Sequence, residues 1–277
     1  MTAGEILQKP SIYIKKGFGK IQRRMIRLPE GAITKKINRK VLYEFKLEPF
    51  LNEDDFRAML TSSYDIILCD FLKKHLVEGD IFIDVGANVG YISAVAASYV
   101  GTSGEIHSFE PLKECFLRLQ TLGDLNPAIT FKFNNVALGA ESGTLPIAYN
   151  PQGDSRNATL VPSERCIKTY SVPVVRLDDY IKENISNPER IKVIKIDVEG
   201  FEFPVLKGLE RFFTEKNYRP LIVCEVKPWV VSKVGCTLEI FDSYMRKFSY
   251  QSYNVLLQNK PIDLQKLRDL EVVLFRG

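Results

Sequence analysis

Acidic and amide side chains follow apolar segments at several points along this chain. Each lies at or just after the end of a segment with the composition of a buried strand: Asp84, Glu110, Asn135, Asp197, Glu199 and Glu225. The carboxyl ends of parallel strands meet at one edge of an open α/β sheet, where ligands bind. We therefore expect these side chains to share one site. Carboxylates gathered there can accept hydrogen bonds from hydroxyl groups, take up a proton, or hold a divalent cation through oxygen.

The most informative of these strand ends is a glycine turn. The apolar run Ile81–Val85 predicts a buried parallel strand, and the small residues of Tyr91–Val100 predict a helix after the turn. Gly86 and Gly90 lack a Cβ, so the backbone can turn sharply and a ligand can approach it closely. Their spacing, G-x-x-x-G, is neither the dinucleotide pattern G-x-G-x-x-G nor a phosphate loop. Because Asp84 would repel a diphosphate, a cationic ligand such as S-adenosylmethionine (SAM) is favoured; the alternative is a tight turn that binds nothing.

Two later strand ends suit the rest of such a ligand. Glu110 ends the second strand about 26 positions after Asp84, and dinucleotide-binding folds use an acid in this place to bind ribose hydroxyls. Asn135 follows the third strand, where an amide side chain could contact the edge of an adenine ring. The first three strands therefore predict a site for an adenosyl ligand.

The fourth and fifth strand ends could carry the chemistry. Asp197 could deprotonate a hydroxyl as a general base, and Asp197 and Glu225 could share a divalent cation such as Mg²⁺ with substrate oxygens. A structural alternative is that Asp197 caps the next helix and Glu199 lies in its first turn, where the helix dipole favours an acid. We take Asp197, Glu199 and Glu225 as the catalytic candidates and assign no metal-binding residue.

Strands and helices alternate from residue 64 onward, as in an α/β protein. We expect strands at 81–85, 105–109, 129–133, 191–196, 221–226, 253–257 and 271–275, and helices that include 64–77, 91–100, 112–123 and 241–248. Residues 139–175 interrupt this alternation with a hairpin around the polar loop 150–168. We therefore divide the chain into an N-terminal extension, 1–63, and a ligand-binding domain, 64–277, with an insertion around 139–175. The extension is expected to contain a basic helix within 4–28 and a strand within 40–51.

The composition is that of a globular protein. The chain has 277 residues, of which 45% are hydrophobic and 26% charged, which is enough for one large core. No apolar run reaches the roughly 20 residues needed to span a bilayer, and no signal peptide is expected. The 5 cysteines form no C-x-x-C pair, so neither a zinc site nor a disulfide framework is expected. We expect a reducing, cytoplasmic location.

The charge is distributed unevenly along the chain. Residues 1–41 contain 11 Lys or Arg and 2 acidic residues, whereas the remainder contains 27 basic and 32 acidic residues. Such a basic arm could attract nucleic acid or an anionic membrane surface, or it could be a solvated extension. The body has no basic stripe interleaved with aromatic residues, so nucleic acid is not the expected partner.

The ordered set of motifs resembles the FkbM-type SAM-dependent methyltransferases. The resemblance rests on GDIFIDVGANVGY at 79–91, Phe109-Glu110-Pro111, Asn135-Val136-Ala137-Leu138, RLDDY at 176–180 and KIDVEGFE at 195–202. It covers roughly residues 64–275. It implies a Rossmann-like class I methyltransferase fold, with a seven-stranded, mostly parallel sheet, helices on both faces and an antiparallel last strand. It also implies O-methylation of a sugar, glycolipid, glycan or natural-product hydroxyl.

The resemblance also implies roles for individual residues. The methionine part of SAM would be held by the first motif, through Asp84, Gly86, Ala87, Asn88, Gly90 and Tyr91. Glu110 with Pro111 would hold the ribose and Asn135 with Val136 the adenine, while Asp197 would lie near the transferred methyl group. The expected partner is a small-molecule or glycan acceptor, and a homo-oligomer is expected. One alternative is a SAM-binding protein or methyltransferase that reaches nucleic acid through the basic arm; a nucleotide-sugar or dinucleotide enzyme is disfavoured by the glycine spacing.

The basic arm gives a first testable prediction. Deleting residues 1–41 is expected to weaken binding to vesicles that contain anionic lipid, or to change the oligomeric state, because the arm carries most of the excess positive charge. Vesicle co-sedimentation and light scattering measure these two properties. If both stay unchanged, the arm is a passive extension.

Overall fold

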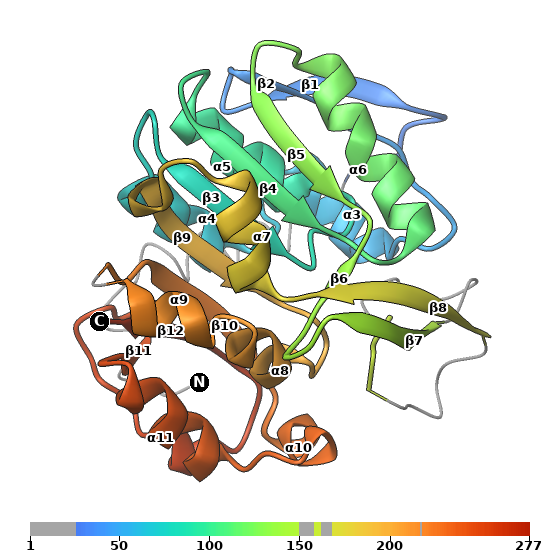
Figure 1. Cartoon of the computed structure of the whole chain (residues 1–277). Helices are drawn as coiled ribbons and strands as arrows, with labels where there is room; N and C mark the ends of the chain where they lie inside the picture. The colour runs from blue at the N-terminus through green and yellow to red at the C-terminus, as the bar shows by residue number, and fades with distance from the viewer. Residues whose placement is uncertain (1–25, 150–157, 162–167, 217) are drawn as a thin grey trace.

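A seven-stranded sheet forms the centre of the molecule (Figure 1). The computed structural model describes residues 26–149, 158–161, 168–216 and 218–277. The strand order is β11-β12-β10-β9-β3-β4-β5. The strands are β3 (Ile81–Val85), β4 (Glu105–Phe109), β5 (Thr130–Asn134), β9 (Ile191–Ile196), β10 (Leu221–Val226), β11 (Gln251–Asn254) and β12 (Glu271–Arg276). β12 runs antiparallel to both of its neighbours, β11 and β10, and all other neighbouring strands are parallel, so the predicted fold is confirmed.

Helices cover both faces of this sheet because its central strands are apolar on both sides. One face packs against α7 (Leu177–Asn184), α8 (Glu202–Lys207), α9 (Glu210–Glu215) and α11 (Leu238–Lys247). The other packs against α4 (Ile66–His75), α5 (Tyr91–Val100) and α6 (Lys113–Leu125). The alternation is visible in β3, where Ile81, Ile83 and Val85 join the first cluster and Phe82 joins the second. The short α10 (Pro228–Val231) follows β10.

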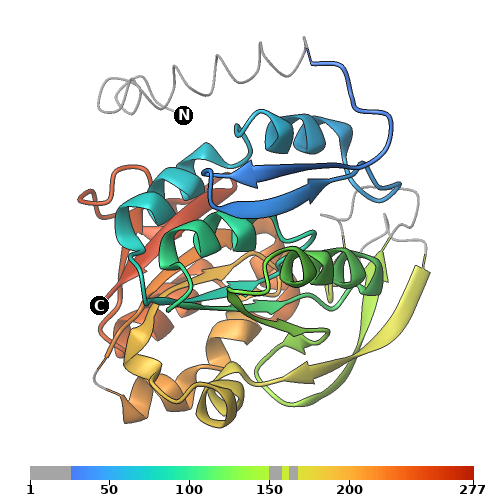
Figure 2. The same ribbon diagram turned by 90° about the horizontal axis from the view of Figure 1, so that it is seen from above.

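An N-terminal hairpin extends the second of these hydrophobic clusters. It consists of β1 (Ile33–Ile37) and β2 (Val41–Phe45), followed by α3 (Glu53–Leu60). Figure 2 shows the hairpin outside the helices that cover the sheet. The prediction of a strand within 40–51 is therefore right only for its first part, and β1 was not predicted. The predicted helix within 4–28 lies almost wholly outside the described residues.

Buried polar contacts fasten the hairpin to the domain. The side chain of Asn126, at the end of α6, pairs with both the N–H and the C=O of Leu42, each at 2.8 Å. Arg118 of α6 is buried and forms an ion pair with Glu44 at 2.7 Å. The hydroxyl of Tyr43 donates to the carbonyl of Val89 at 2.9 Å, which links β2 to the glycine turn. A deletion that tests the basic arm must therefore end before Ile33, since a deletion to residue 41 also removes β1.

The interruption of the alternation forms a second, smaller sheet. Its order is β6-β8-β7, with β6 (Ala137–Leu138), β7 (Gly143–Tyr149) and β8 (Lys168–Val175). The two strands of the hairpin predicted within 139–175 correspond to β7 and β8, which pair antiparallel. Most of the predicted polar loop lies outside the described residues. Near the C-terminus, the strand expected at 253–257 is wrong in its bounds, because β11 ends at Asn254, whose side chain accepts from the N–H groups of Leu256 and Leu257.

Within the part of the chain that the structure describes, no helix combines the length and the apolar character needed to cross a bilayer.

The packing of the hairpin gives a stability prediction. Phe45→Ala should lower the free energy of unfolding by about 3–5 kcal/mol, because the ring is buried against the domain and its removal leaves a cavity. Urea denaturation followed by tryptophan fluorescence and circular dichroism measures this. The matched control is Leu117→Ala on α6, whose side chain is 55% exposed and whose loss should cost less than about 0.5 kcal/mol. Equal, small effects of both variants would mean that the hairpin is a dispensable appendage.

Candidate active site

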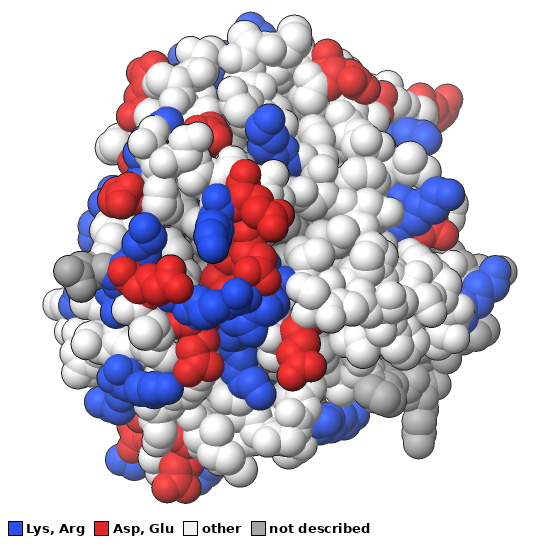
Figure 3. All heavy atoms as spheres, in the orientation of Figure 1, with Lys and Arg blue, Asp and Glu red and all other residues white. Residues whose placement is uncertain are grey.

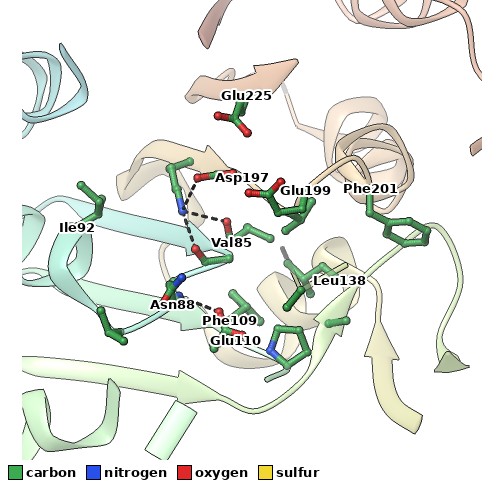
Figure 4. A pocket seen from close by; sticks show the side chains of 18 of the residues that line it. Val85, Asn88, Ile92, Phe109, Glu110, Leu138, Asp197, Glu199, Phe201 and Glu225 are labelled. Atoms are coloured by element: carbon green, nitrogen blue, oxygen red, sulfur yellow. Dashed lines mark hydrogen bonds and ion pairs between the residues drawn. The ribbon is translucent and has the colours of Figure 1, made fainter. Parts of the chain in front are cut away.

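A cavity of about 270 Å³ opens at the carboxyl ends of the central strands, where the predicted site was expected (Figure 4). The predicted residues that line it are Gly86, Ala87, Asn88, Tyr91, Glu110, Pro111, Val136, Asp197, Glu199 and Glu225. Figure 4 places Asn88 and Glu110 on one side of the cavity and Asp197, Glu199 and Glu225 on the other. Asp84, Gly90 and Asn135 do not line it. The predicted site is thus divided between residues that face the cavity and residues that support it.

The turn after β3 requires glycine at Gly86. Its φ is +77°, and a Cβ there would lie 1.9 Å from the carbonyl oxygen of Asp197. The N–H groups of Gly86 and Ala87 both donate to the carbonyl of Phe109 at 3.0 Å. The turn is therefore held against the ends of β4 and β9 at once, so that backbone atoms instead of side chains border the cavity.

Gly90 serves the packing of the turn. It has a φ of +82°, and a Cβ there would lie 2.6 Å from Leu119 of α6. It is the residue before α5, so it sets the start of that helix. Gly90 does not line the cavity, and its missing side chain makes room for α6; its contact with the ligand stays a prediction.

Asp84 also does not line the cavity, and its predicted contact with the ligand stays a prediction. It is fully buried, and its carboxylate lies 3.1 Å from the ammonium group of Lys195 on β9. Ser93 of α5 donates to its other oxygen at 2.7 Å. The negative charge that suggested a cationic ligand is therefore balanced within the protein. Lys195 also donates to the carbonyl of Gly86 at 2.7 Å, so the pair fixes the glycine turn.

Glu110 lies at the cavity with both of its carboxylate oxygens held. The N–H groups of Asn88 and Leu112 each donate to it at 2.8 Å. Burial raises the pKa of Glu110 to about 7, although these two hydrogen bonds and the positive charge of Lys195 oppose the rise. The carboxylate is fixed in orientation and keeps acceptor capacity, because each oxygen has two lone pairs. It can accept further hydrogen bonds from hydroxyl groups, and its contact with a ribose stays a prediction.

Asn135 does not line the cavity, and its predicted contact with adenine stays a prediction. Its amide donates to the carbonyls of Glu110 and Pro111, at 2.8 and 3.2 Å. Its neighbour Val136 lines the cavity, together with Phe109 and Pro111. This part of the cavity is therefore apolar, and Asn135 holds the backbone of one wall.

The opposite side of the cavity carries the catalytic candidates. One carboxylate oxygen from each of Asp197, Glu199 and Glu225 lies within 4.8 Å of the others. Lys227, directly after β10, lies 2.8 Å from Glu225 and also pairs with Glu199. Burial, followed by the charge of Asp197, raises the pKa of Glu225 to about 8, despite the nearby ammonium of Lys227. Glu225 therefore gains or loses its proton close to neutral pH, as is expected of a general acid or base.

Two contacts fix the loop that carries Asp197 and Glu199. Glu202 is buried and accepts from the N–H groups of Val198 and Gly200, at 3.2 and 2.9 Å. Thr159, between β7 and β8, donates to the carbonyl of Glu199 at 2.9 Å. Glu199 itself has a φ of +56°, which is unusual for a residue with a side chain. The alternative that Asp197 caps the next helix is not supported, because α8 begins at Glu202 and no side chain caps it.

The sequence left open a divalent cation shared by Asp197 and Glu225, and Glu199 lies beside them in the structure. Three oxygen ligands at this separation have the chemistry of a Mg²⁺ or Mn²⁺ site. The ammonium of Lys227, however, already balances Glu199 and Glu225, and a metal ion would have to displace it. The residues therefore do not fit a resident metal well, and we derive no chemical step through one.

Several lining residues were missed by the sequence analysis. Met59 and Leu68 reach the cavity from α3 and α4, with Tyr64 and Asp65 from the link between these helices. Ile147 reaches it from β7, and Ala158, Thr159 and Leu160 from the described part of the connection between β7 and β8. No motif marks them, because they reach the site only through tertiary packing. One contact that brings the first group there is the edge-to-face pair of Tyr64 and Tyr91, whose centroids are 5.6 Å apart. Lys227 could have been found from the sequence, because it directly follows the strand predicted at 221–226 and so lies at the edge of the sheet where the site was expected.

The chain is similar in sequence to known methyltransferases. The model of the methyltransferase FkbM domain matches residues 84–253, which include most of the cavity. Methyltransferase sdnD from Sordaria araneosa is 30% identical over 194 residues, which are 60% of this chain and 72% of that protein. Hexuronic acid methyltransferase AglP from Haloferax volcanii is 29% identical over 150 residues, which are 53% of this chain and only 57% of the relative.

A solved structure with a similar fold is that of an FkbM methyltransferase from Methylobacillus flagellatus KT. It is 17% identical, with a TM-score of 0.45, over 82% of this chain and 56% of that chain. The chain therefore spans little more than half the length of two of these three proteins.

The raised pKa of Glu110 gives a pH prediction for the binding of S-adenosylhomocysteine (SAH), the product form of SAM. Ribose hydroxyls donate to the ionised carboxylate, so the bound state has a lower pKa than the free state and affinity increases as pH rises through about 7. Calorimetric titrations from about pH 6 to about pH 8 should show up to about tenfold tighter binding at the upper end. Glu110→Gln should bind more weakly and lose this step.

Glu225→Gln is the matched control for this titration, because Glu225 also titrates in the same range but lies on the other side of the cavity. It should keep the step. A step that disappears in Glu225→Gln and persists in Glu110→Gln would contradict the assignment of the ribose site.

Proposed function

The chain belongs to the FkbM methyltransferase family, and from this premise we propose that it is a SAM-dependent O-methyltransferase that acts on a hydroxyl group of a sugar, glycan, glycolipid or natural product. One observation supports the proposal above all: two sides of one cavity carry different groups. Glu110 on one side suits a ribose, and the cluster of Asp197, Glu199 and Glu225 on the other suits an acceptor hydroxyl. The name of the archaeal relative, a hexuronic acid methyltransferase, supports a sugar as acceptor.

The lining residues fit SAM. Glu110 offers fixed acceptor oxygens for the ribose, and Phe109, Pro111 and Val136 offer apolar walls for the adenine. When bound there, SAM would supply a methyl group on a sulfonium, which becomes the thioether of SAH as the acceptor oxygen takes the methyl. The glycine turn would border the methionine part with backbone atoms, because Gly86 and Ala87 line the cavity without bulky side chains.

The protein's part in the reaction is to position a hydroxyl and to remove its proton. Asp197 lies at the end of β9, directly beside the glycine turn, since its N–H donates to the carbonyl of Val85 at 3.1 Å. Its carboxylate is 40% exposed and lines the cavity, so it can accept the hydroxyl proton as the general base. Glu199 and Glu225 would accept hydrogen bonds from other hydroxyl groups of the methyl acceptor. Positioning the oxygen in line with the methyl group supplies much of the acceleration.

The alternative of a nucleic-acid acceptor has less support from the described residues. Asp65, Glu110, Asp197, Glu199 and Glu225 line the cavity and would repel a phosphate backbone. On the face shown in Figure 3, basic and acidic side chains lie next to one another instead of forming a basic stripe. Residues 1–25 of the basic arm lie outside the described residues.

The proposal predicts separate effects for two carboxylates. Asp197→Asn should lower kcat about 100-fold or more, because the amide cannot take the proton, while SAH affinity changes by less than about threefold. Glu199→Gln should instead raise KM for the acceptor. The assay follows transfer of a tritiated methyl group from SAM to a panel of methyl glycosides and natural-product alcohols, with the product identified by mass spectrometry. Full activity of Asp197→Asn would exclude it as the base.

A further inference from the structure

The loop between β9 and α8 carries the proposed general base, and a buried acid outside the cavity holds its backbone. Glu202, the first residue of α8, is 2% exposed and does not line the cavity. One of its carboxylate oxygens accepts from the N–H groups of both Val198 and Gly200, at 3.2 and 2.9 Å. A single buried oxygen therefore binds two N–H groups of a loop that borders the active site.

These two N–H groups converge on one oxygen around a residue with an unusual backbone conformation. Glu199, which lies between them, has a φ of +56°, in the left-handed region that residues with a side chain rarely adopt. Backbone N–H groups in such a turn form a concave site that binds an anion. Here the chain supplies the anion itself, in the carboxylate of Glu202. An ionised acceptor forms stronger hydrogen bonds than a neutral one, so its charge stabilises a backbone conformation that is otherwise unfavourable.

The contact with Glu202 fixes one of the two peptide groups that flank Asp197. The N–H of the preceding peptide group, that of Asp197 itself, donates to the carbonyl of Val85 at 3.1 Å. The N–H of the following peptide group, that of Val198, donates to Glu202. Because peptide groups are planar, these two groups together determine φ and ψ at Asp197. They therefore also set the direction in which its side chain leaves the backbone, and that side chain lines the cavity (Figure 4).

The far end of the loop is held from two sides. The peptide group between Glu199 and Gly200 donates its N–H to Glu202, and its C=O accepts from the hydroxyl of Thr159, each at 2.9 Å. One contact comes from α8, and the other comes from the connection between β7 and β8. The loop therefore cannot tilt toward or away from the cavity without breaking one of these hydrogen bonds.

We propose that Glu202 is a positioning residue for methyl transfer, because its carboxylate holds the loop in the conformation that directs Asp197 toward the acceptor hydroxyl. This inference rests on the proposed function and adds a residue that acts without touching either substrate. A misplacement of about 1 Å in a reacting group can lower the rate about 100-fold. Burial raises the pKa of Glu202 to about 7, whereas the N–H groups of the loop favour its ionised form.

A double-variant cycle tests whether Glu202 acts through Asp197. The assay is the methyl transfer to the acceptor panel described above, at about pH 8.5, where the carboxyl of Glu202 is ionised. Glu202→Gln should lower kcat about tenfold, because the neutral amide is a weaker acceptor, and should change SAH affinity by less than about threefold. Added to Asp197→Asn, it should lower kcat by less than about twofold further, since a base that is absent cannot be misplaced. A tenfold loss in both backgrounds would overturn the inference.

Hydrogen exchange tests the same contact without any acceptor. Mass spectrometry should show that amides of the loop 197–201 exchange at least about tenfold faster in Glu202→Gln than in the wild-type protein, because the N–H groups of Val198 and Gly200 lose their charged partner. Amides of β4, on the other side of β3, should exchange at unchanged rates. A loop that stays as protected as in the wild type would contradict the proposal.

Asp178 provides the matched control. It is 6% exposed, accepts from the N–H of Arg211 at 3.1 Å and does not line the cavity. Asp178→Asn removes a buried charge that binds backbone, as Glu202→Gln does. It should change kcat by less than about twofold and leave exchange in the loop 197–201 unchanged. An equal loss of kcat in the two variants would mean that buried acids in general support activity, and the inference about Glu202 would be wrong.

The outcomes separate the two proposals. If the folded wild-type protein neither binds SAH nor methylates any member of the panel, the proposed function fails, and hydrogen exchange still decides whether Glu202 holds the loop. If the wild-type protein is active and Asp197→Asn is not, but Glu202→Gln retains full kcat, only the inference about Glu202 is overturned.

Discussion

The ion pair between Lys195 and Asp84 is the interaction on which the rest of the site depends. The two residues lie opposite each other on β9 and β3, the neighbouring central strands, and both are buried. Neighbouring negative charges, Asp84 first, raise the pKa of Lys195 although burial opposes this, so the ammonium stays charged. Removing either partner would leave an uncompensated buried charge, which typically costs about 3–5 kcal/mol. The pair also carries the glycine turn, because Lys195 donates to the carbonyl of Gly86.

From this pair the site extends in two directions with different chemistry. Toward β4, Glu110 is fixed by backbone N–H groups and is bordered by apolar residues. Toward β10, carboxylates crowd around Lys227. Glu110, Glu202 and Glu225 all have pKa values raised from 4.5, to about 7, 7 and 8. Because these folded-state values lie above the unfolded one, the free energy of unfolding falls as pH rises from about 4.5 to about 8. Hydroxyl groups bound to Glu110 and Glu225, which line the cavity, would offset part of that loss.

The sequence predicted the sheet well, but it did not show which of the site residues line the cavity, for identifiable reasons. Strands such as 191–196 and 221–226 were found to the residue because they are mostly apolar and each is followed directly by a charged side chain. The first strand of the N-terminal hairpin was missed because its exposed lysines resemble a basic arm and its turn, at Asn38 and Arg39, contains no glycine. The position of each carboxylate at the sheet edge was predictable from strand order. Whether a carboxylate faces a ligand or another side chain was not, since that depends on partners far away in the sequence, as Lys195 is from Asp84.

A crystal structure of the full-length protein with SAH tests the central claim most directly. The account predicts that SAH lies at the carboxyl ends of β3, β4 and β9, with ribose hydroxyls on Glu110, the amino-acid part beside the turn at Gly86, and the sulfur facing Asp197. Asp84 should remain paired with Lys195 and make no direct contact with SAH. SAH bound elsewhere, or a Glu110 carboxylate that makes no contact with the ribose, would contradict this account of the site.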